Sequence, residues 1–330
     1  MLKKIINAPS DCVREAGEGF LAAFGSAYEA VPGVMGLKII NKKDKPALVI
    51  GGGSGHEPMF AYFIGDNLAD AAAIGNVFAS PDPNTIVQTA LSVQAGKGVL
   101  FVYGNYAGDN MNFDIAAEML EDMGIGCETV RVRDDIASAP RERIEDRRGI
   151  AGDLFVVKIA GAATAAGLDL KEAARVTAKA CDSVYSIGVG LSGATIPGER
   201  KPIFELPDDE IEFGLGIHGE PGIKRVKLVS ADEMVETLVR LLLVDSGIKG
   251  GDLVCTYVNG LGSTTLMELY IANRKLRGLL NERGIKVFDM EVNSYVTSQE
   301  MAGMSISFLK LDDELMRYYT MPCSSPYYKK

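Results

Sequence analysis

The sequence predicts an α/β protein with two lobes. Short apolar runs alternate along the chain with segments whose apolar residues recur at helical spacing. Glycine-rich strings follow several of these runs, as they do in strand-to-helix loops. The length of 330 residues suits about two domains of roughly 150 residues each. We expect the first lobe over residues 1–184 and the second over residues 185–330, because the composition shifts after the strand predicted from residue 184.

The first lobe is predicted to repeat a strand-and-helix unit. Ala47–Ile50 is typical of a buried strand, and it runs into a glycine-rich loop and a helix that begins near Pro58, since proline suits a first helical turn. Val99–Tyr103 is a second strand, and apolar residues at helical spacing follow it at 115–123. Leu154–Val157 begins a third unit, with alanine-rich helices extending to about residue 181.

The second lobe is predicted to open with a strand at Val184–Leu191, followed by a proline-rich, acidic link over residues 196–209. Beyond this link we expect, in order, a helix at about 231–243, a strand at 252–257, a helix at about 264–283, and strands near 287–290 and 305–309.

Charge and cysteine usage exclude several classes of function. The net charge of −10 disfavours a nucleic-acid partner, and acidic residues interrupt the basic run Arg141–Arg148, which favours a solvated loop or helix face. No apolar run approaches the roughly 18 residues of a membrane span, and the N-terminus lacks the apolar region of a signal peptide. Five scattered cysteines indicate reduced thiols in the cytoplasm and disfavour a transition-metal centre.

The chain has only two histidines, and each lies in a glycine-rich string that contains a Glu-Pro pair. The first string is Gly51-Gly-Gly-Ser-Gly-His-Glu-Pro58, and the second is Gly214-Leu-Gly-Ile-His-Gly-Glu-Pro-Gly222. Histidine titrates near physiological pH and serves as a proton carrier or a nucleophile. We therefore predict that His56 and His218 form two walls of one active site.

Three loops are predicted to meet at the carboxyl ends of strands, where ligands bind in open α/β sheets. They are Gly51–His56, Gly75–Pro81 and Gly104–Asp109. The first lacks the lysine of a phosphate-binding loop and has His56 where a dinucleotide fingerprint needs glycine, so binding of ATP or NAD by this chain is disfavoured. A tight turn without catalytic purpose is the alternative.

The carboxylates near these loops each allow two interpretations. Asp109 is either a helix N-cap or a base that accepts a hydroxyl proton. Glu57 and Glu220 either orient the neighbouring histidines or cap helices, and the sequence does not decide between these roles.

The chain resembles the dihydroxyacetone-binding K subunit of dihydroxyacetone kinase over about residues 7–329. Besides both histidine strings, the matching strings are Val77-Phe-Ala-Ser-Pro81, Asn105-Tyr-Ala-Gly-Asp109 with Met111-Asn-Phe113, Lys158-Ile-Ala-Gly161, Phe204-Glu-Leu-Pro207, Val258-Asn-Gly-Leu-Gly262, and Met301-Ala-Gly303 with Leu309-Lys-Leu-Asp-Asp313. The resemblance implies a homodimer of two-lobed α/β subunits, with mixed or parallel sheets flanked by helices.

The resemblance also implies the chemistry of a glycerone kinase subunit. His218 would add to the ketone of dihydroxyacetone and hold it as a hemiaminal, Asp109 would accept a hydroxyl proton, and His56 would assist. The residues implied in substrate binding are Gly53, Ser54, Gly55, His56, Ser80, Gly104, Asp109 and His218.

Two departures from the family pattern shape these expectations. Many members have a lysine before the Asn-Tyr pair, where this chain has Gly104, and the added room could admit a four-carbon ketose such as erythrulose. The chain also lacks the family's nucleotide-binding region. We expect no cofactor on this chain, and we expect Mg and ADP or ATP on a separate L-type subunit. The phosphoryl group would come either from exchanged ATP or from an M-type subunit of the phosphotransferase system, which would rephosphorylate the bound ADP. A non-catalytic coactivator that senses dihydroxyacetone is the rival interpretation, and a lyase or isomerase is disfavoured.

Overall fold

A computed structural model describes residues 3–41 and 43–330, which divide into two compact units. The first unit comprises Lys3–Val132, Phe155–Cys181 and Leu315–Lys330, and the second comprises Arg133–Leu154 and Asp182–Glu314. The chain therefore changes unit after residues 132, 154, 181 and 314, whereas a single boundary near residue 184 was expected from the sequence. A short segment that packs against distant parts of the chain leaves no shift in composition. Each unit contains one six-stranded sheet with helices, which confirms the predicted α/β class.

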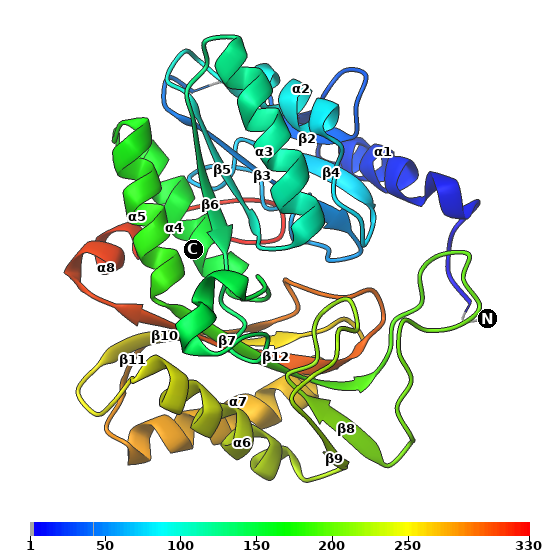
Figure 1. Ribbon diagram of the computed structural model, residues 1–330, viewed down its shortest axis with the longest axis vertical. Coiled ribbons are helices and arrows are strands. Elements are labelled where there is room, and N and C mark those ends of the chain that lie inside the picture. The colour runs from blue at the N-terminus through cyan, green and yellow to red at the C-terminus, as the bar shows by residue number, and fades with distance from the viewer. Residues whose placement is uncertain (1–2, 42) are drawn as a thin grey trace. The chain divides into compact units, whose positions relative to one another are not determined.

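The sheet of the first unit has the strand order β1-β2-β4-β3-β5-β6 (Figure 1). Its strands are β1 (Tyr28–Ala30), β2 (Gly36–Ile39), β3 (Ala47–Ser54), β4 (Ala71–Val77), β5 (Val99–Gly104) and β6 (Cys127–Val132). Strands β3 to β6 pair in parallel, and β1 and β2 extend the sheet with antiparallel pairs. The chain passes from β3 to β4 on one side and then to β5 on the other, so β3 marks the topological switch point.

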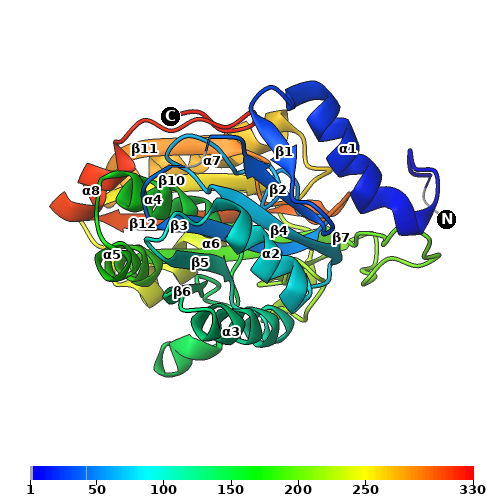
Figure 2. The same ribbon diagram turned by 90° about the horizontal axis from the view of Figure 1, so that it is seen from above.

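Helices cover both faces of this sheet. Helices α2 (Pro83–Val93) and α3 (Ala107–Asp122) lie side by side on one face (Figure 2). Val49 and Phe101 of the sheet belong to the core that these helices share. Leu48 and Ile50, which alternate with Val49 along β3, are equally buried, as expected for a strand of a parallel sheet. The other helices with residues in this unit are α1 (Cys12–Phe24), α4 (Asp153–Ala165), α5 (Leu170–Asp182) and α8 (Asp313–Tyr319).

Two predicted elements of the first lobe are wrong. Residues 58–62 form turns rather than a helix, with the N–H of Tyr62 donating to the carbonyl of Pro58. Leu154–Val157 lies in helix α4, because a short apolar run cannot distinguish a buried helix from a buried strand. The strand of that third unit is β6, an edge strand whose partly exposed face carries Cys127, Thr129 and Arg131, so the strand shows no apolar run.

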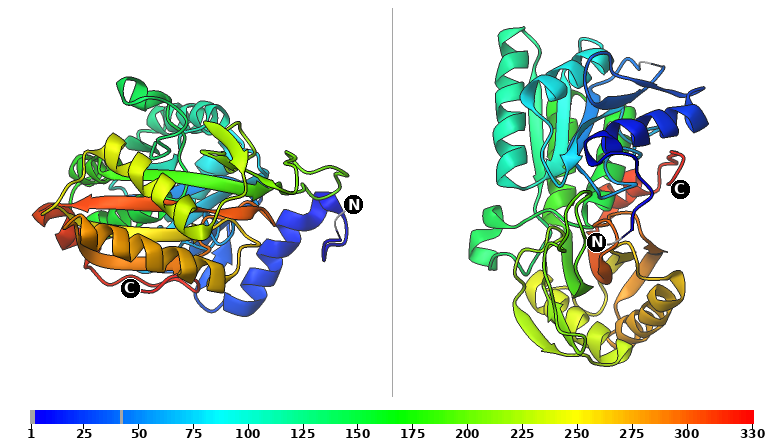
Figure 3. Two further views of the ribbon diagram at one scale, coloured as in Figure 1. Left: turned by 90° about the horizontal axis from the view of Figure 1, so that it is seen from below. Right: turned by 90° about the vertical axis from the view of Figure 1, so that its right-hand side faces the viewer.

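The sheet of the second unit has the strand order β11-β10-β12-β7-β8-β9 and is mostly antiparallel. Its strands are β7 (Val184–Ser192), β8 (Glu210–Phe213), β9 (Lys224–Lys227), β10 (Leu253–Gly260), β11 (Lys286–Asn293) and β12 (Ala302–Leu311). Helices α6 (Ala231–Ser246) and α7 (Leu266–Glu282) pack side by side across its strands (Figure 3). Both helices begin with a capping box, at Ser230 and Thr265. Within the described residues, no helix is both long and apolar enough to cross a membrane.

Candidate active site

The first unit brings His56, Ser80 and Asp109 to one edge of its sheet. They follow β3, β4 and β5, and because these strands are parallel, their carboxyl ends lie at the same edge. The side-chain amide of Asn112 on α3 donates to the carbonyl of Pro81 at 2.9 Å, which ties this helix to the loop after β4. The edge coincides with the switch point at β3, where open α/β sheets bind ligands. The predicted meeting of the three loops is thus confirmed within this unit.

Gly51, Gly52 and Gly53 of the first string belong to strand β3 rather than to the predicted loop, whereas Gly55 lies in the turn that follows. A Cβ added at Gly52 would lie 2.7 Å from the ring of Phe60, and one at Gly53 would lie 2.7 Å from the backbone nitrogen of Ala79. These glycines therefore let the following turn and the loop after β4 pack directly against the strand. The hydroxyl of Ser54 donates to the carbonyl of Gly75 at 2.8 Å, so it holds the two strand ends together.

His56 is buried, with 2% of its surface exposed, and its ring packs on Phe78 at a centroid distance of 5.2 Å. Glu57 accepts the N–H of Gly55 with both carboxylate oxygens at 3.0 Å, which fixes the turn that carries His56. Burial raises the pKa of Glu57, although the Gly55 N–H favours its charged form. Glu57 thus stabilises the backbone turn beside His56. Of the two roles that the sequence left open, this one is closer to orienting the histidine than to capping a helix.

Asp109 lies in the first turn of α3, three residues after the N-cap position at Tyr106. It is therefore not the N-cap, and that interpretation is wrong. Its half-buried carboxylate lies in the turn where the helix dipole favours a negative charge. Burial raises the pKa of Tyr103 to about 12, and the charge of Asp109 acts in the same direction. Gly104 is buried at the end of β5, and Ser80 is half-buried, with its hydroxyl donating to the carbonyl of Pro81 at 3.2 Å.

In the second unit, His218 lies in the loop that joins β8 to β9. The loop is held by backbone bonds from Gly214 to the carbonyl of Gly188 at 2.7 Å and from Ile223 to that of Phe213 at 2.8 Å. The hydroxyl of Ser298 donates to the carbonyl of Ile217. The side chain of His218 keeps 24% of its surface exposed, so a small molecule can reach it.

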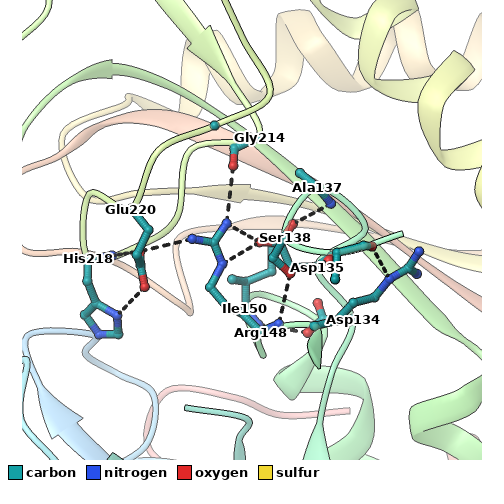
Figure 4. Close-up of polar contacts among 12 residues, drawn as sticks. Asp134, Asp135, Ala137, Ser138, Arg148, Ile150, Gly214, His218 and Glu220 are labelled. Atoms are coloured by element: carbon teal, nitrogen blue, oxygen red, sulfur yellow. Dashed lines mark hydrogen bonds and ion pairs between the residues drawn. The ribbon is translucent and has the colours of Figure 1, made fainter. Parts of the chain in front are cut away.

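Glu220 contacts His218 at two points. One carboxylate oxygen accepts the backbone N–H of His218 at 3.0 Å, and the other lies 3.3 Å from ring nitrogen Nδ1 (Figure 4). Burial alone raises the pKa of Glu220, but the contact with His218 and the charge of Arg148 outweigh it and lower this pKa to about 2. Glu220 is therefore ionised at neutral pH and orients His218, which decides between its two proposed roles.

The residues behind Glu220 were not predicted from the sequence. Arg148 lies 3.6 Å from Glu220 and donates to the buried carboxylate of Asp135 at 2.8 and 3.1 Å. Its neighbour Arg147 is 1% exposed and forms a two-bond pair with Asp245. The interpretation of Arg141–Arg148 as a solvated face is thus wrong at its last two residues. The available signal was that the pair Arg147-Arg148 stands directly before the apolar Gly149-Ile150-Ala151.

The prediction that His56 and His218 face one active site stays a prediction, because the two histidines lie in different units. Among the residues that the structure describes, no cluster of three or more His, Cys, Asp or Glu side chains is arranged to hold a metal ion.

Comparison with known proteins matches residues 18–327 to the Dak1 domain. The chain belongs to the Dak1 domain family. It is 42% identical, over 99% of both chains, to the dihydroxyacetone-binding subunit DhaK of PTS-dependent dihydroxyacetone kinase 2 from Listeria innocua. It is also 42% identical to L-erythrulose kinase of Pectobacterium atrosepticum, covering 99% of this chain but 56% of that protein. The predicted membership of the dihydroxyacetone kinase family is confirmed.

The solved structures that match this chain include proteins named for dihydroxyacetone kinase. The dihydroxyacetone kinase of C. freundii superposes with a TM-score of 0.92 at 29% identity, covering 100% of this chain and 60% of that one. The dihydroxyacetone kinase operon co-activator Dha-DhaQ superposes with a TM-score of 0.88 at 29% identity, covering 94% of this chain and 96% of that one. The chain thus spans nearly all of some relatives and little more than half of others.

Proposed function

We propose that this chain is the substrate-binding, catalytic subunit of a ketose kinase that acts on dihydroxyacetone or a close analogue. The observation that carries the proposal is the 42% identity, over nearly the full length of both chains, to a dihydroxyacetone-binding subunit. The pairing of His218 with an ionised carboxylate supports it, because such a partner prepares an imidazole to act as a nucleophile.

The proposed reaction begins with addition of His218 to the ketone. The lone pair of a ring nitrogen forms a bond to the carbonyl carbon, the carbonyl π pair moves to oxygen, and that oxygen takes up a proton from solvent. The nitrogen that has added carries no second proton, so the hemiaminal cannot dehydrate to a Schiff base. Glycerol has no carbonyl and is excluded by this step. The bond holds one hydroxyl of the ketose in a fixed position for phosphoryl transfer.

Asp109 is proposed as the base that accepts the proton of the reacting hydroxyl, with His56 assisting by hydrogen bonding or proton transfer. Their position at the switch point of a parallel sheet supports this role. Gly53, Ser54, Gly55, Ser80 and Gly104 would line the same edge of the sheet.

The phosphoryl group is proposed to come from a separate L-type subunit that carries Mg and ADP or ATP. This chain spans only 56% of an erythrulose kinase and 60% of the C. freundii kinase, so those chains contain a region that it does not match. Its near-full-length relatives from Listeria innocua and Lactococcus lactis are named as subunits of PTS-dependent kinases, which favours the phosphotransferase system as donor.

A four-carbon ketose is a second candidate substrate. Three relatives at 40–42% identity are named erythrulose kinases. In the family that the chain resembles, many members have lysine where this chain has Gly104, and the proposal is that the smaller residue would leave room for one more carbon of the substrate.

Reconstitution tests the proposed function. Phosphorylation of dihydroxyacetone and erythrulose is measured with the chain alone and after addition of an L-type subunit with its donor. We expect turnover only with the partner, none with glycerol, and a lower preference for erythrulose in the Gly104→Lys variant. Turnover by the chain alone, or a tight and saturable ATP site on it, would overturn the proposal. Adduct formation without turnover with any partner would instead favour a sensor like the co-activator relative.

A further inference from the structure

We propose that Arg148 is a positioning residue for His218, acting through Glu220 and held in place by Asp135. The inference rests on the proposed function, because it concerns how His218 is prepared to add to a ketose. All four residues lie in the second unit, and their contacts run from the buried carboxylate of Asp135 to the ring of His218 (Figure 4).

The first step is that Asp135 fixes the guanidinium of Arg148. Nε and Nη2 both donate to Oδ2 of Asp135, at 3.1 and 2.8 Å, and Nη2 also lies 3.4 Å from the carbonyl of Gly214. The backbone of Arg148 is held as well, because its N–H donates to Ser138 at 3.0 Å and its carbonyl accepts the N–H of Asp135 at 3.0 Å. A planar guanidinium held through two of its nitrogens has one orientation, which directs Nη1 at Glu220.

The second step is that Arg148 fixes the carboxylate of Glu220. Nη1 lies 3.6 Å from Oε2, the same oxygen that accepts the backbone N–H of His218 at 3.0 Å. Gly216 makes this approach possible. A Cβ at that position would lie 2.1 Å from Oε2 of Glu220 and 2.5 Å from Nη1 of Arg148. The loop therefore omits a side chain where the ion pair needs the space.

The third step is that Glu220 selects the tautomer of His218. An ionised carboxylate only accepts hydrogen bonds, so Nδ1, at 3.3 Å from Oε1, must carry the hydrogen. The lone pair is then on Nε2, the nitrogen on the far side of the ring from Glu220, and it is available to attack. When Nε2 adds to the carbonyl carbon and the oxygen takes up a proton, the ring gains a positive charge. A fixed carboxylate at Nδ1 then holds the adduct more tightly than the neutral ring.

The test uses the full chain labelled with ¹⁵N-histidine. Only two imidazole rings then have to be assigned, because the chain contains two histidines. Imidazole NMR gives the tautomer of His218, and intact mass spectrometry at increasing dihydroxyacetone gives the adduct dissociation constant. Arg148→Lys keeps the charge but removes the planar fork. We expect a mixture of tautomers of His218 and a dissociation constant of the adduct about tenfold higher. This is the size expected when the hydrogen bond between Glu220 and the ring of His218 is lost. Glu220→Gln is the second variant, with the same expectation, should Arg148→Lys fail to fold.

Arg147→Lys is the matched control. It changes the adjacent arginine, which is more buried and forms its own two-bond pair with Asp245. We expect it to lower thermal stability while leaving the tautomer and the adduct constant unchanged. The proposal is overturned if folded Arg148→Lys or Glu220→Gln keeps the single Nδ1–H tautomer and binds within twofold of wild type. Absence of an adduct in the wild type would instead contradict the proposed function, and the tautomer would still decide the role of Arg148.

Discussion

Replacing Gly216 by alanine perturbs the contact between Glu220 and His218 without changing a charged group. The new Cβ would lie 2.1 Å from Oε2 of Glu220, whereas non-bonded atoms keep about 3.4 Å or more apart. The carboxylate must therefore move by roughly 1.3 Å. Its other oxygen lies 3.3 Å from Nδ1 of His218, already at the long end of hydrogen bonding, so a shift of this size breaks that contact.

The cost falls on the adduct rather than on folding. A hydrogen bond that involves a charged group contributes about 1.5–3 kcal/mol. We take the bond from Glu220 to the neutral ring near the lower value and the bond to the cationic ring of the adduct near the upper value. Losing this bond therefore weakens the adduct by the difference of about 1.5 kcal/mol, which is roughly tenfold weaker binding of dihydroxyacetone. The atoms that clash are ends of flexible side chains, so we expect the melting temperature to fall by no more than about 4 °C.

Mass-spectrometric titration of the adduct and thermal unfolding measure the two effects in the same samples. Gly188→Ala is the control, because its Cβ would meet its nearest atoms at ordinary distances of 3.5 and 3.6 Å. Gly216→Ala that binds the ketose within twofold of wild type would refute the reasoning. So would a loss of binding that accompanies a large drop in melting temperature, since the site would then have been lost by unfolding.

Two further predictions concern single carboxylates. With the proper partner, Asp109→Asn should lower turnover at least about 100-fold while leaving the adduct intact, and near-normal turnover would restrict Asp109 to a structural part of α3. Burial raises the pKa of Asp135 to about 7, despite the opposing charge of Arg148, so between about pH 4 and pH 7 the folded state holds a proton on Asp135 that the unfolded state has released, and above this range Asp135 is the carboxylate that pairs with Arg148. The free energy of unfolding should therefore fall as pH rises from about 4 to about 7 and level off above. Asp135→Asn should flatten this slope in denaturant titrations, and an unchanged slope would assign the pH dependence elsewhere.

The parts of the fold that the sequence predicted correctly are those with strong local patterns. The buried strands at Ala47 and Val99 and the long helices of the second unit follow directly from apolar periodicity. The helix expected at Pro58 failed because proline suits tight turns as well as first helical turns. Strand β6 was missed because an edge strand with one exposed face carries too few apolar residues.

The candidate site was predicted only as far as its local strings. His56, Ser80 and Asp109 could be placed together because parallel strands bring their following loops to one edge. The role of Glu220 could not be decided, since Glu57 stands in a similar string and reaches a backbone N–H instead. The contacts of Arg148 with Asp135 and with Glu220 could not be predicted from the sequence, because they depend on tertiary packing across 13 and 72 positions of the chain.

The measurement that tests the central claim most directly is the location of the ketose adduct. Intact mass spectrometry after incubation with dihydroxyacetone should show one adduct per chain, and peptide mapping should place it on His218. His218→Ala should abolish the adduct, His56→Ala should weaken turnover more than adduct formation, and glycerol should give no adduct at any concentration. An adduct on another residue, or one that persists in His218→Ala, would contradict the account.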